Sequence, residues 1–168
     1  MKKLFKVLIF LLLVGISIAL LFIGNGYNMY KETIEAMPLE EKVEEIRGKE
    51  NYAEFSELPQ MYVKAVISVE DKRFFKHNGI DIIAIGRAAI NDIKAMSYVE
   101  GGSTITQQLA KNMYFTQEKI MERKIAEVFM AWKIEDNYSK EDIFELYVNS
   151  IYFGDGYYTV KEAARRIF

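Results

Sequence analysis

The acidic pair Glu70-Asp71 is the first place where this sequence could carry out chemistry. It directly follows the apolar run Met61 to Val69, whose spacing is helical, so we expect at least one carboxylate where the core meets a cleft. Partial burial suits a carboxyl group to proton transfer. The pair could equally be an ordinary helix end. His77 fits a structural role, and as the only histidine it excludes a metal site built from several histidines.

A second candidate is the stretch in which Gly101 and Gly102 lead into Ser103 and Thr104. Thr104 and Gln107 have the spacing of a helix capping box. A helix start preceded by glycines offers free amide donors, which suit a phosphate group. The Gly-Lys-Ser/Thr ending of a Walker A loop is missing, and a plain capped helix is the alternative.

The third candidate is Arg123-Lys124-Ile125-Ala126-Glu127, in which both cations lie one helical turn before the carboxylate. Such a group is either a surface ion pair, which contributes ~0.3–0.5 kcal/mol, or a docking place for a diphosphate. The fourth segment, Glu145 to Gly156, ends a helix and continues into an aromatic loop with two glycines. We interpret it as scaffold that shapes the floor of a cleft.

The composition limits the class of protein. The 168 residues are 51% hydrophobic and contain no cysteine, so a packed core is expected and disulfides and thiolate metal sites are excluded. The formal net charge is −2, and the chain is more acidic once its three N-terminal lysines are set aside. A mildly acidic body argues against nucleic-acid binding, so an anionic substrate must meet a local cluster of cations.

Residues 7–24 are apolar or small and predict a transmembrane anchor. Eighteen residues in a helix cover about 27 Å, close to the ~30 Å hydrocarbon core. The lysines before this run predict a cytoplasmic stub at residues 1–6 and a chain that continues outside the cytoplasm. A cleaved signal peptide is the alternative, although no Ala-x-Ala site follows the run. A buried soluble helix fits less well, because no polar stripe interrupts the run.

The rest of the chain predicts a mainly α fold. Residues 25–57 are polar and acidic and are interpreted as a stalk or linker helix, or as a solvated helix on the domain surface. Leu58-Pro59 marks a boundary before a domain at 58–168. Helical spacing covers Met61–Val69, Ile80–Ile93 and Glu118–Asp136, and Ser139 with Asp142 predicts a capped helix from Glu141 to Asn149. The chain ends in a helical pattern without a cap, so we expect the C-terminal part of this domain to be missing.

Together these segments resemble the lysozyme-like peptidoglycan glycosyltransferase family, close to its monofunctional membrane-anchored members. The resemblance extends from about Leu58 to Phe168. It lies in four motifs that occur in the family's order: Glu70-Asp71-x-x-Phe74-x-x-His77-x-Gly79, Gly101-Gly102-Ser103-Thr104-Ile105-Thr106-Gln107-Gln108, Arg123-Lys124-x-x-Glu127, and Leu146-Tyr147-Val148-Asn149 with Gly154-x-Gly156. The sequence departs from the family at Thr159, where a glycine is usual, and at Ile167, where an aromatic residue is usual.

The resemblance implies polymerisation of lipid II into a β-1,4 glycan, with inversion at the donor sugar and release of undecaprenyl diphosphate. Glu70 would be the general base that takes the proton from the acceptor 4-hydroxyl. Glu127 would assist the leaving diphosphate, through a divalent cation such as Mg or Mn or by holding cationic groups in place. The other residues implied for the donor and acceptor sites are Arg87, Ser103, Thr104, Gln107, Gln108, Lys111, Arg123 and Lys124.

The implied setting is the cell membrane, with a single span, a cytoplasmic N-terminus and an extracellular catalytic domain that serves cell wall biogenesis and cell shape. The implied partners are lipid II, the growing glycan strand, the membrane and cell-wall synthesis proteins, and no nucleic acid. Because Ser-x-x-Lys is absent from the sequence, no transpeptidase module is expected. Two alternatives stay open: a lysozyme-like enzyme that cleaves glycan, and a non-enzymatic, truncated membrane protein of the same family.

Overall fold

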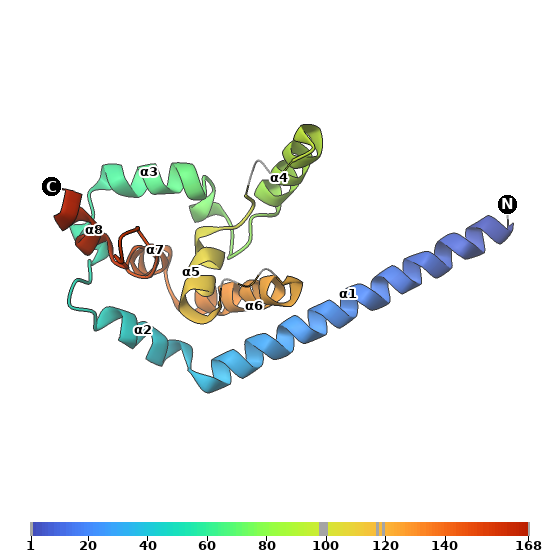
Figure 1. The fold of residues 1–168 in the computed structure, drawn as a ribbon, viewed down its shortest axis with the longest axis horizontal. Helices are drawn as coiled ribbons and strands as arrows, with labels where there is room; N and C mark the ends of the chain where they lie inside the picture. The colour runs from blue at the N-terminus through green and yellow to red at the C-terminus, as the bar shows by residue number, and fades with distance from the viewer. Residues whose placement is uncertain (1, 98–100, 117, 119, 168) are drawn as a thin grey trace.

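The computed structural model describes residues 2–97, 101–116, 118 and 120–167. Its first element is α1 (Lys2–Ala36), a single uninterrupted helix that extends far from the rest of the molecule (Figure 1). The stretch Lys3–Ala36 is long and apolar enough to cross a membrane, and its apolar side chains are exposed from Leu4 to Ile23. At ~1.5 Å per residue, the helix exceeds the ~30 Å hydrocarbon core, so its C-terminal third continues beyond a bilayer.

The remaining elements form a mainly α domain, as expected from the sequence. They are α2 (Leu39–Arg47), η1 (Phe55–Glu57), α3 (Gln60–Glu70), η2 (Phe74–Lys76), α4 (Ile82–Ala95), α5 (Ile105–Tyr114), α6 (Met121–Asn137), α7 (Lys140–Val148) and α8 (Val160–Ile167). Within the described residues there is no β-strand, only two isolated bridges.

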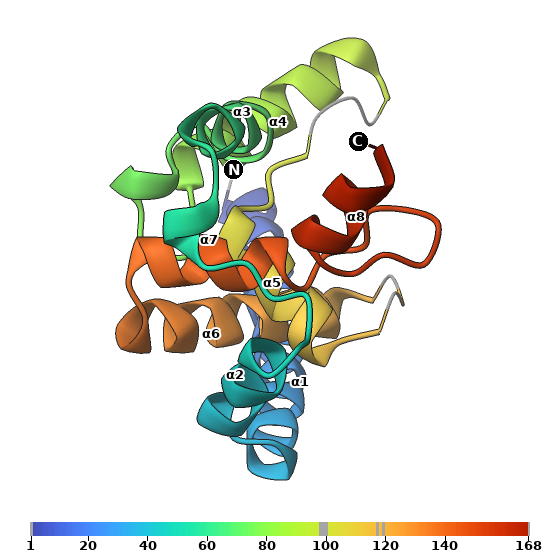
Figure 2. The ribbon, with the colours of Figure 1, turned by 90° about the vertical axis from the view of Figure 1, so that its left-hand side faces the viewer.

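Helix α5 is the centre of the core. Its residues Ile105, Leu109 and Ala110 are fully buried, and the helix packs against α6 and α7 (Figure 2). Phe74 from η2 and Phe144 from α7 are also fully buried in the same cluster. The residues that open and flank α5 are therefore held on a rigid support.

The segment 25–57 is part of this core and not only a solvated stalk. In α2, Leu39, Val43 and Ile46 are buried in the cluster that contains the core of α5, while the glutamates of the same helix face solvent. The chain after α2 is held by Asn149, whose side chain accepts from Ala53 N at 3.0 Å and donates to Ala53 O at 2.9 Å. The packed domain therefore begins before the boundary that Leu58-Pro59 suggests.

The helix starts follow the capping chemistry that the sequence predicts. Thr104 with Gln107 and Ser139 with Asp142 both form complete capping boxes. Thr159 is buried before α8, where its backbone N–H donates to Glu162 Oε2 and its hydroxyl accepts from Glu162 N. Thr159 thus caps α8, and it does not adopt a positive φ angle that would require glycine.

Helix α4 projects from the body of the domain (Figure 1). Its N-cap is Asp81, whose carboxylate accepts from the backbone N–H groups of Ile83 and Ala84. The helix and its C-cap residue expose large apolar side chains, which are Ile82, Ile83, Ile85, Ile90, Ile93 and Met96.

Candidate active site

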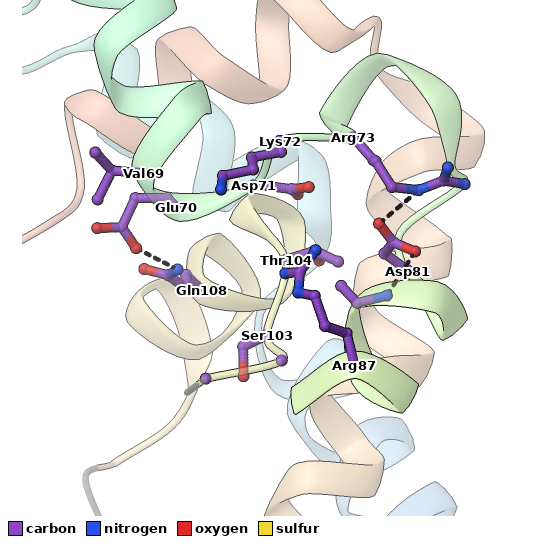
Figure 3. Close-up of a pocket in the computed structure, with 13 residues that line it drawn as sticks. Val69, Glu70, Asp71, Lys72, Arg73, Asp81, Arg87, Ser103, Thr104 and Gln108 are labelled. Carbon is purple, nitrogen blue, oxygen red and sulfur yellow. Dashed lines mark hydrogen bonds and ion pairs between the residues drawn. The ribbon is translucent and has the colours of Figure 1, made fainter. Parts of the chain in front are cut away.

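Two neighbouring hollows lie around the start of α5. The first, about 300 Å³, lies between the end of α3, the start of α4 and the chain that leads into α5 (Figure 3). The second, about 260 Å³, lies between α5 and α6. Ser103 and Gln108 line both hollows. We call the two together the cleft, because they share these lining residues.

Glu70 is the last residue of α3 and lies on one wall of the cleft, with its side chain exposed. Gln108 Nε2 donates a hydrogen bond of 2.9 Å to Glu70 Oε2 (Figure 3). The orientation of that amide is set by Tyr147, whose hydroxyl donates to Gln108 Oε1 at 3.2 Å. Burial raises the pKa of Tyr147, with the nearby Glu70 charge as a second cause, so the hydroxyl stays protonated and remains a donor. Tyr147 therefore acts on Glu70 through Gln108, beyond the scaffold role expected for its segment.

Asp71, the neighbour of Glu70, is buried and ties this turn to α5. Its Oδ2 accepts from Ile105 N at 3.0 Å, and its carboxylate also lies 3.0 Å from His77 Nε2. His77 thus has a structural partner. Since the adjacent residue is pinned to the start of α5, the backbone at Glu70 is fixed relative to Gln108 on the same helix.

Two of the backbone amides at the N-terminus of α5, where we expected a phosphate site, already have partners within the protein. The N–H of Ile105 is taken by Asp71, and the N–H of Gln107 donates to Thr104 Oγ1 at 3.1 Å. A carboxylate from 34 residues away thus occupies the place that we expected an anion to take at this helix start. Thr104 and Gln107 line the cleft, but they are buried and bonded to each other, and the Thr104 hydroxyl donates to Gly79 O at 2.7 Å.

The opposite wall of the cleft carries Glu127 and two cations on α6. Glu127 has 1% of its side chain exposed, and its two oxygens accept from Arg123 at 2.6 Å and Lys124 at 2.8 Å. Lys124 Nζ also donates to Ser103 Oγ at 2.8 Å, and 41% of its side chain remains exposed toward the cleft. This is not the surface ion pair of the alternative interpretation, because its carboxylate is buried. Lys124 presents positive charge to the cleft from a fixed position.

The other expected cations are also at the cleft. Lys111 lines the second hollow, and Arg87 lines the first from an exposed position on α4 (Figure 3). The first hollow has two further cations that we did not predict, Lys72 and Arg73. Arg73 Nε donates to Asp81 Oδ2 at 2.9 Å. Their position directly after Glu70-Asp71 was the available signal, because all four residues follow one another in the chain at the end of α3.

Carboxylates and His77 also lie together near the cleft. Ligand atoms of Asp71, His77 and Asp81 all lie within 4.8 Å of one another. The two carboxylates, however, already accept from Ile105 N, from the start of α4 and from Arg73. At Glu127 both oxygens already accept from cations, so a Mg or Mn ion there would share the carboxylate with Lys124 and Arg123. Arg123 and Lys124 thus supply the positive charge beside Glu127.

Comparison with known proteins identifies the family of the chain. Residues 38–168 match the family model described as Transglycosylase. The chain is 41% identical to penicillin-binding protein 1F of Bacillus subtilis (strain 168), over 99% of this chain and 25% of that protein. It is 46% identical to a monofunctional glycosyltransferase of Staphylococcus epidermidis (strain ATCC 12228 / FDA PCI 1200), over 75% of this chain and 48% of that protein.

A second monofunctional glycosyltransferase, from Staphylococcus haemolyticus (strain JCSC1435), is 36% identical over 99% of this chain and 60% of its own length. The chain thus spans from a quarter to three fifths of the lengths of these three relatives. The family model covers most of the chain and begins at Pro38, just before α2. The chain belongs to the transglycosylase family.

Proposed function

We propose that this chain is a peptidoglycan glycosyltransferase that polymerises a lipid-linked disaccharide, lipid II, into β-1,4 glycan with inversion. One observation carries the proposal. The carboxylate of Glu70 and the cation of Lys124 lie on opposite walls of the cleft. Glu70 is hydrogen-bonded to Gln108 and Lys124 to Ser103, and these two partners line both hollows. The names of the relatives point in the same direction.

Proton transfer from the acceptor sugar is the role we assign to Glu70. Its carboxylate takes the proton of the acceptor 4-hydroxyl while that oxygen forms a bond to the donor anomeric carbon. The exposed position of Glu70 at the cleft leaves one oxygen for the substrate while the other is held by Gln108. Attack from the face opposite the leaving group inverts the configuration at that carbon.

Stabilisation of the leaving diphosphate is the role we assign to the other wall. The electrons of the broken anomeric bond pass to the diphosphate oxygen, and Lys124 and Arg123 neutralise the charge that develops there. Glu127 is a positioning residue in this scheme, because its two oxygens already hold these cations. Lys111 and Arg87 add positive charge along the cleft.

The membrane setting suits a substrate with a lipid tail. The apolar α1 confines the domain to the bilayer surface, and α4, which carries Arg87, adds exposed isoleucines. We also propose a cytoplasmic N-terminus, from the lysines that precede the apolar run, and association with cell-wall synthesis proteins outside the cell membrane.

The proposal is tested by the products. Purified full chain in detergent is incubated with radiolabelled lipid-linked disaccharide, and in parallel with purified cell walls. We expect β-1,4 polymer and free undecaprenyl diphosphate from the first substrate and no sugar release from the second. Sugar released from cell walls, with no polymer formed, would instead establish a glycan-cleaving enzyme. A folded chain inactive on both would support a binding role.

A further inference from the structure

We propose that the packing of α1 against α6 holds Arg123 and Lys124 at the level of the lipid headgroups, with the first turn of α6 in contact with the bilayer surface. The observation behind this is where α1 first meets the domain. The described side chains of α1 are exposed from Lys3 to Asn25, and Gly26 is its first buried residue. This contact begins two residues after the apolar segment 7–24 ends.

The contact at Gly26 is a close one. A Cβ atom there would lie 2.6 Å from two side-chain atoms of Ile125 and 2.9 Å from the carbonyl oxygen of Glu122. No larger residue fits without moving α6, because one of these atoms belongs to the backbone. By contrast, a Cβ atom at Gly24 would meet nothing within 4 Å.

Aromatic side chains continue the contact away from the bilayer. The ring centroid of Phe129 lies 5.2 Å from that of Tyr27, 6.0 Å from that of Tyr30 and 5.6 Å from that of Trp132. Contacts therefore advance along both helices in the same direction, so α1 and α6 run side by side and roughly parallel (Figure 1). The position of a residue along α6 gives its height above the bilayer.

The heights follow from the rise of a helix. Gly26 lies about 3 Å beyond Gly24, and Ile125 contacts Gly26, so Ile125 and the adjacent Lys124 lie about 3 Å outside the hydrocarbon core. The headgroup layer extends for roughly 5–8 Å on each side of that core. The two cations are therefore at the depth where lipid phosphates lie.

The start of α6 has the composition that this depth requires. Met121 precedes Ile125 by one turn, which places it about 6 Å nearer the bilayer, at the edge of the hydrocarbon. Met121 is 60% exposed and Ile120 is 41% exposed, so both present apolar surface at that depth. Single exposed apolar residues are common, but these two lie where the height predicts lipid contact. Only the link between this height and catalysis rests on the proposed function.

The depth can be measured without any turnover. The chain has no cysteine, so Met121→Cys and Asn137→Cys each give one site for a fluorescent label, in the first and last turns of α6. In vesicles of phosphatidylcholine and phosphatidylglycerol, brominated acyl chains should quench the label at position 121 several-fold more than the label at 137, which lies ~24 Å further along the helix. Equal quenching at the two positions would overturn the proposal.

The contact itself is tested by Gly26→Ala with Gly24→Ala as its matched control. Alanine favours a helix at both positions, so only the contact with α6 differs. Gly26→Ala should reduce quenching at position 121 and lower polymer formation at least tenfold, because a shift of about 1 Å at a reacting group can cost ~100-fold. Gly24→Ala should behave as the parent chain.

Identical behaviour of the two alanine variants in quenching and in polymer formation would refute the positioning role. If the parent chain shows the expected quenching pattern but makes no polymer, the proposed function fails while the membrane contact stands.

Discussion

Replacement of Glu127 by glutamine tests whether this buried carboxylate holds the cationic wall of the cleft. Glu127→Gln keeps the shape of the side chain but removes its charge. In the parent protein, Arg123 and Lys124 lie 2.6 Å and 2.8 Å from its two oxygens. In the variant, two like charges remain side by side on α6 with no anion between them.

The magnitude follows from burial. Removal of one partner of a fully buried ion pair costs about 3–5 kcal/mol. Glu127 is 1% exposed and Arg123 13%, but Lys124 is 41% exposed and can regain water. We therefore expect a loss of about 2–3 kcal/mol in the free energy of unfolding, or roughly 5–10 °C in Tm for a chain of this size. Polymer formation should fall by at least ~100-fold, because the cations lose their fixed position.

The assay is thermal unfolding in detergent, followed by the fluorescence of Trp132, together with polymer formation below the transition. Glu122→Gln, on the same helix and only partly buried, is the matched control and should shift Tm by no more than ~2 °C. Equal Tm values for the two variants would refute the view that Glu127 holds the cations. Full polymer formation by Glu127→Gln would refute the positioning role directly.

Three further outcomes are expected. Lys124→Ala should lower Tm by less than half as much as Glu127→Gln, because Arg123 remains bonded to the carboxylate. The same variant should lower polymer formation ~100-fold, and the same two assays measure both effects. Tyr147→Phe should slow polymer formation roughly 3–10-fold at an unfolding free energy within ~1.5 kcal/mol of the parent, because only one hydrogen bond is lost. The control is Tyr62→Phe, at a partly buried tyrosine of α3, and equal rates for the two variants would contradict this expectation. Asp81→Asn should destabilise the domain by about 1–2 kcal/mol in urea unfolding at pH 7, and that difference should shrink below about pH 4.

The sign of the Asp81 prediction follows from its environment. Burial acts to raise the pKa of this carboxyl, but the backbone N–H groups of Ala84 and Ile83 and the charge of Arg73 outweigh it and hold the pKa below its ordinary value. A depressed pKa in the folded state stabilises the fold at neutral pH, and that stabilisation is lost as pH falls through the folded pKa. A difference between parent and variant that stays constant from pH 7 to pH 3 would contradict the assignment.

Local patterns were sufficient for much of the fold. Helical spacing predicted α3, α4, α6 and α7 near their observed bounds, and both capping boxes form as expected. A helix was expected around α2, but its contribution to the core was not, because only Leu39, Val43 and Ile46 mark its buried face among many charged residues. The average composition of residues 25–57 predicts a solvated stalk. The stripe of three apolar residues in α2 nevertheless packs into the core cluster.

The cleft shows the limit of sequence reasoning more clearly. That Glu70, Lys124 and Glu127 would lie near one another came from family resemblance, and the spacing of single motifs could not supply it. The capture of the Ile105 amide by Asp71 joins residues 34 positions apart, and the link from Tyr147 to Gln108 spans 39. Such contacts depend on tertiary packing. The burial of Glu127 could not be predicted from the sequence either, because its neighbours on α6 include charged residues.

The most direct test of the account is polymer formation by Glu70→Gln beside its affinity for the lipid-linked disaccharide. Glutamine keeps the size of the side chain and its place beside Gln108, but it cannot accept the acceptor proton. We expect binding within about threefold of the parent chain and a polymerisation rate at least ~1,000-fold lower. Glu41→Gln, on the exposed face of α2, should leave both unchanged. Polymer formed by Glu70→Gln at the parental rate would contradict the account.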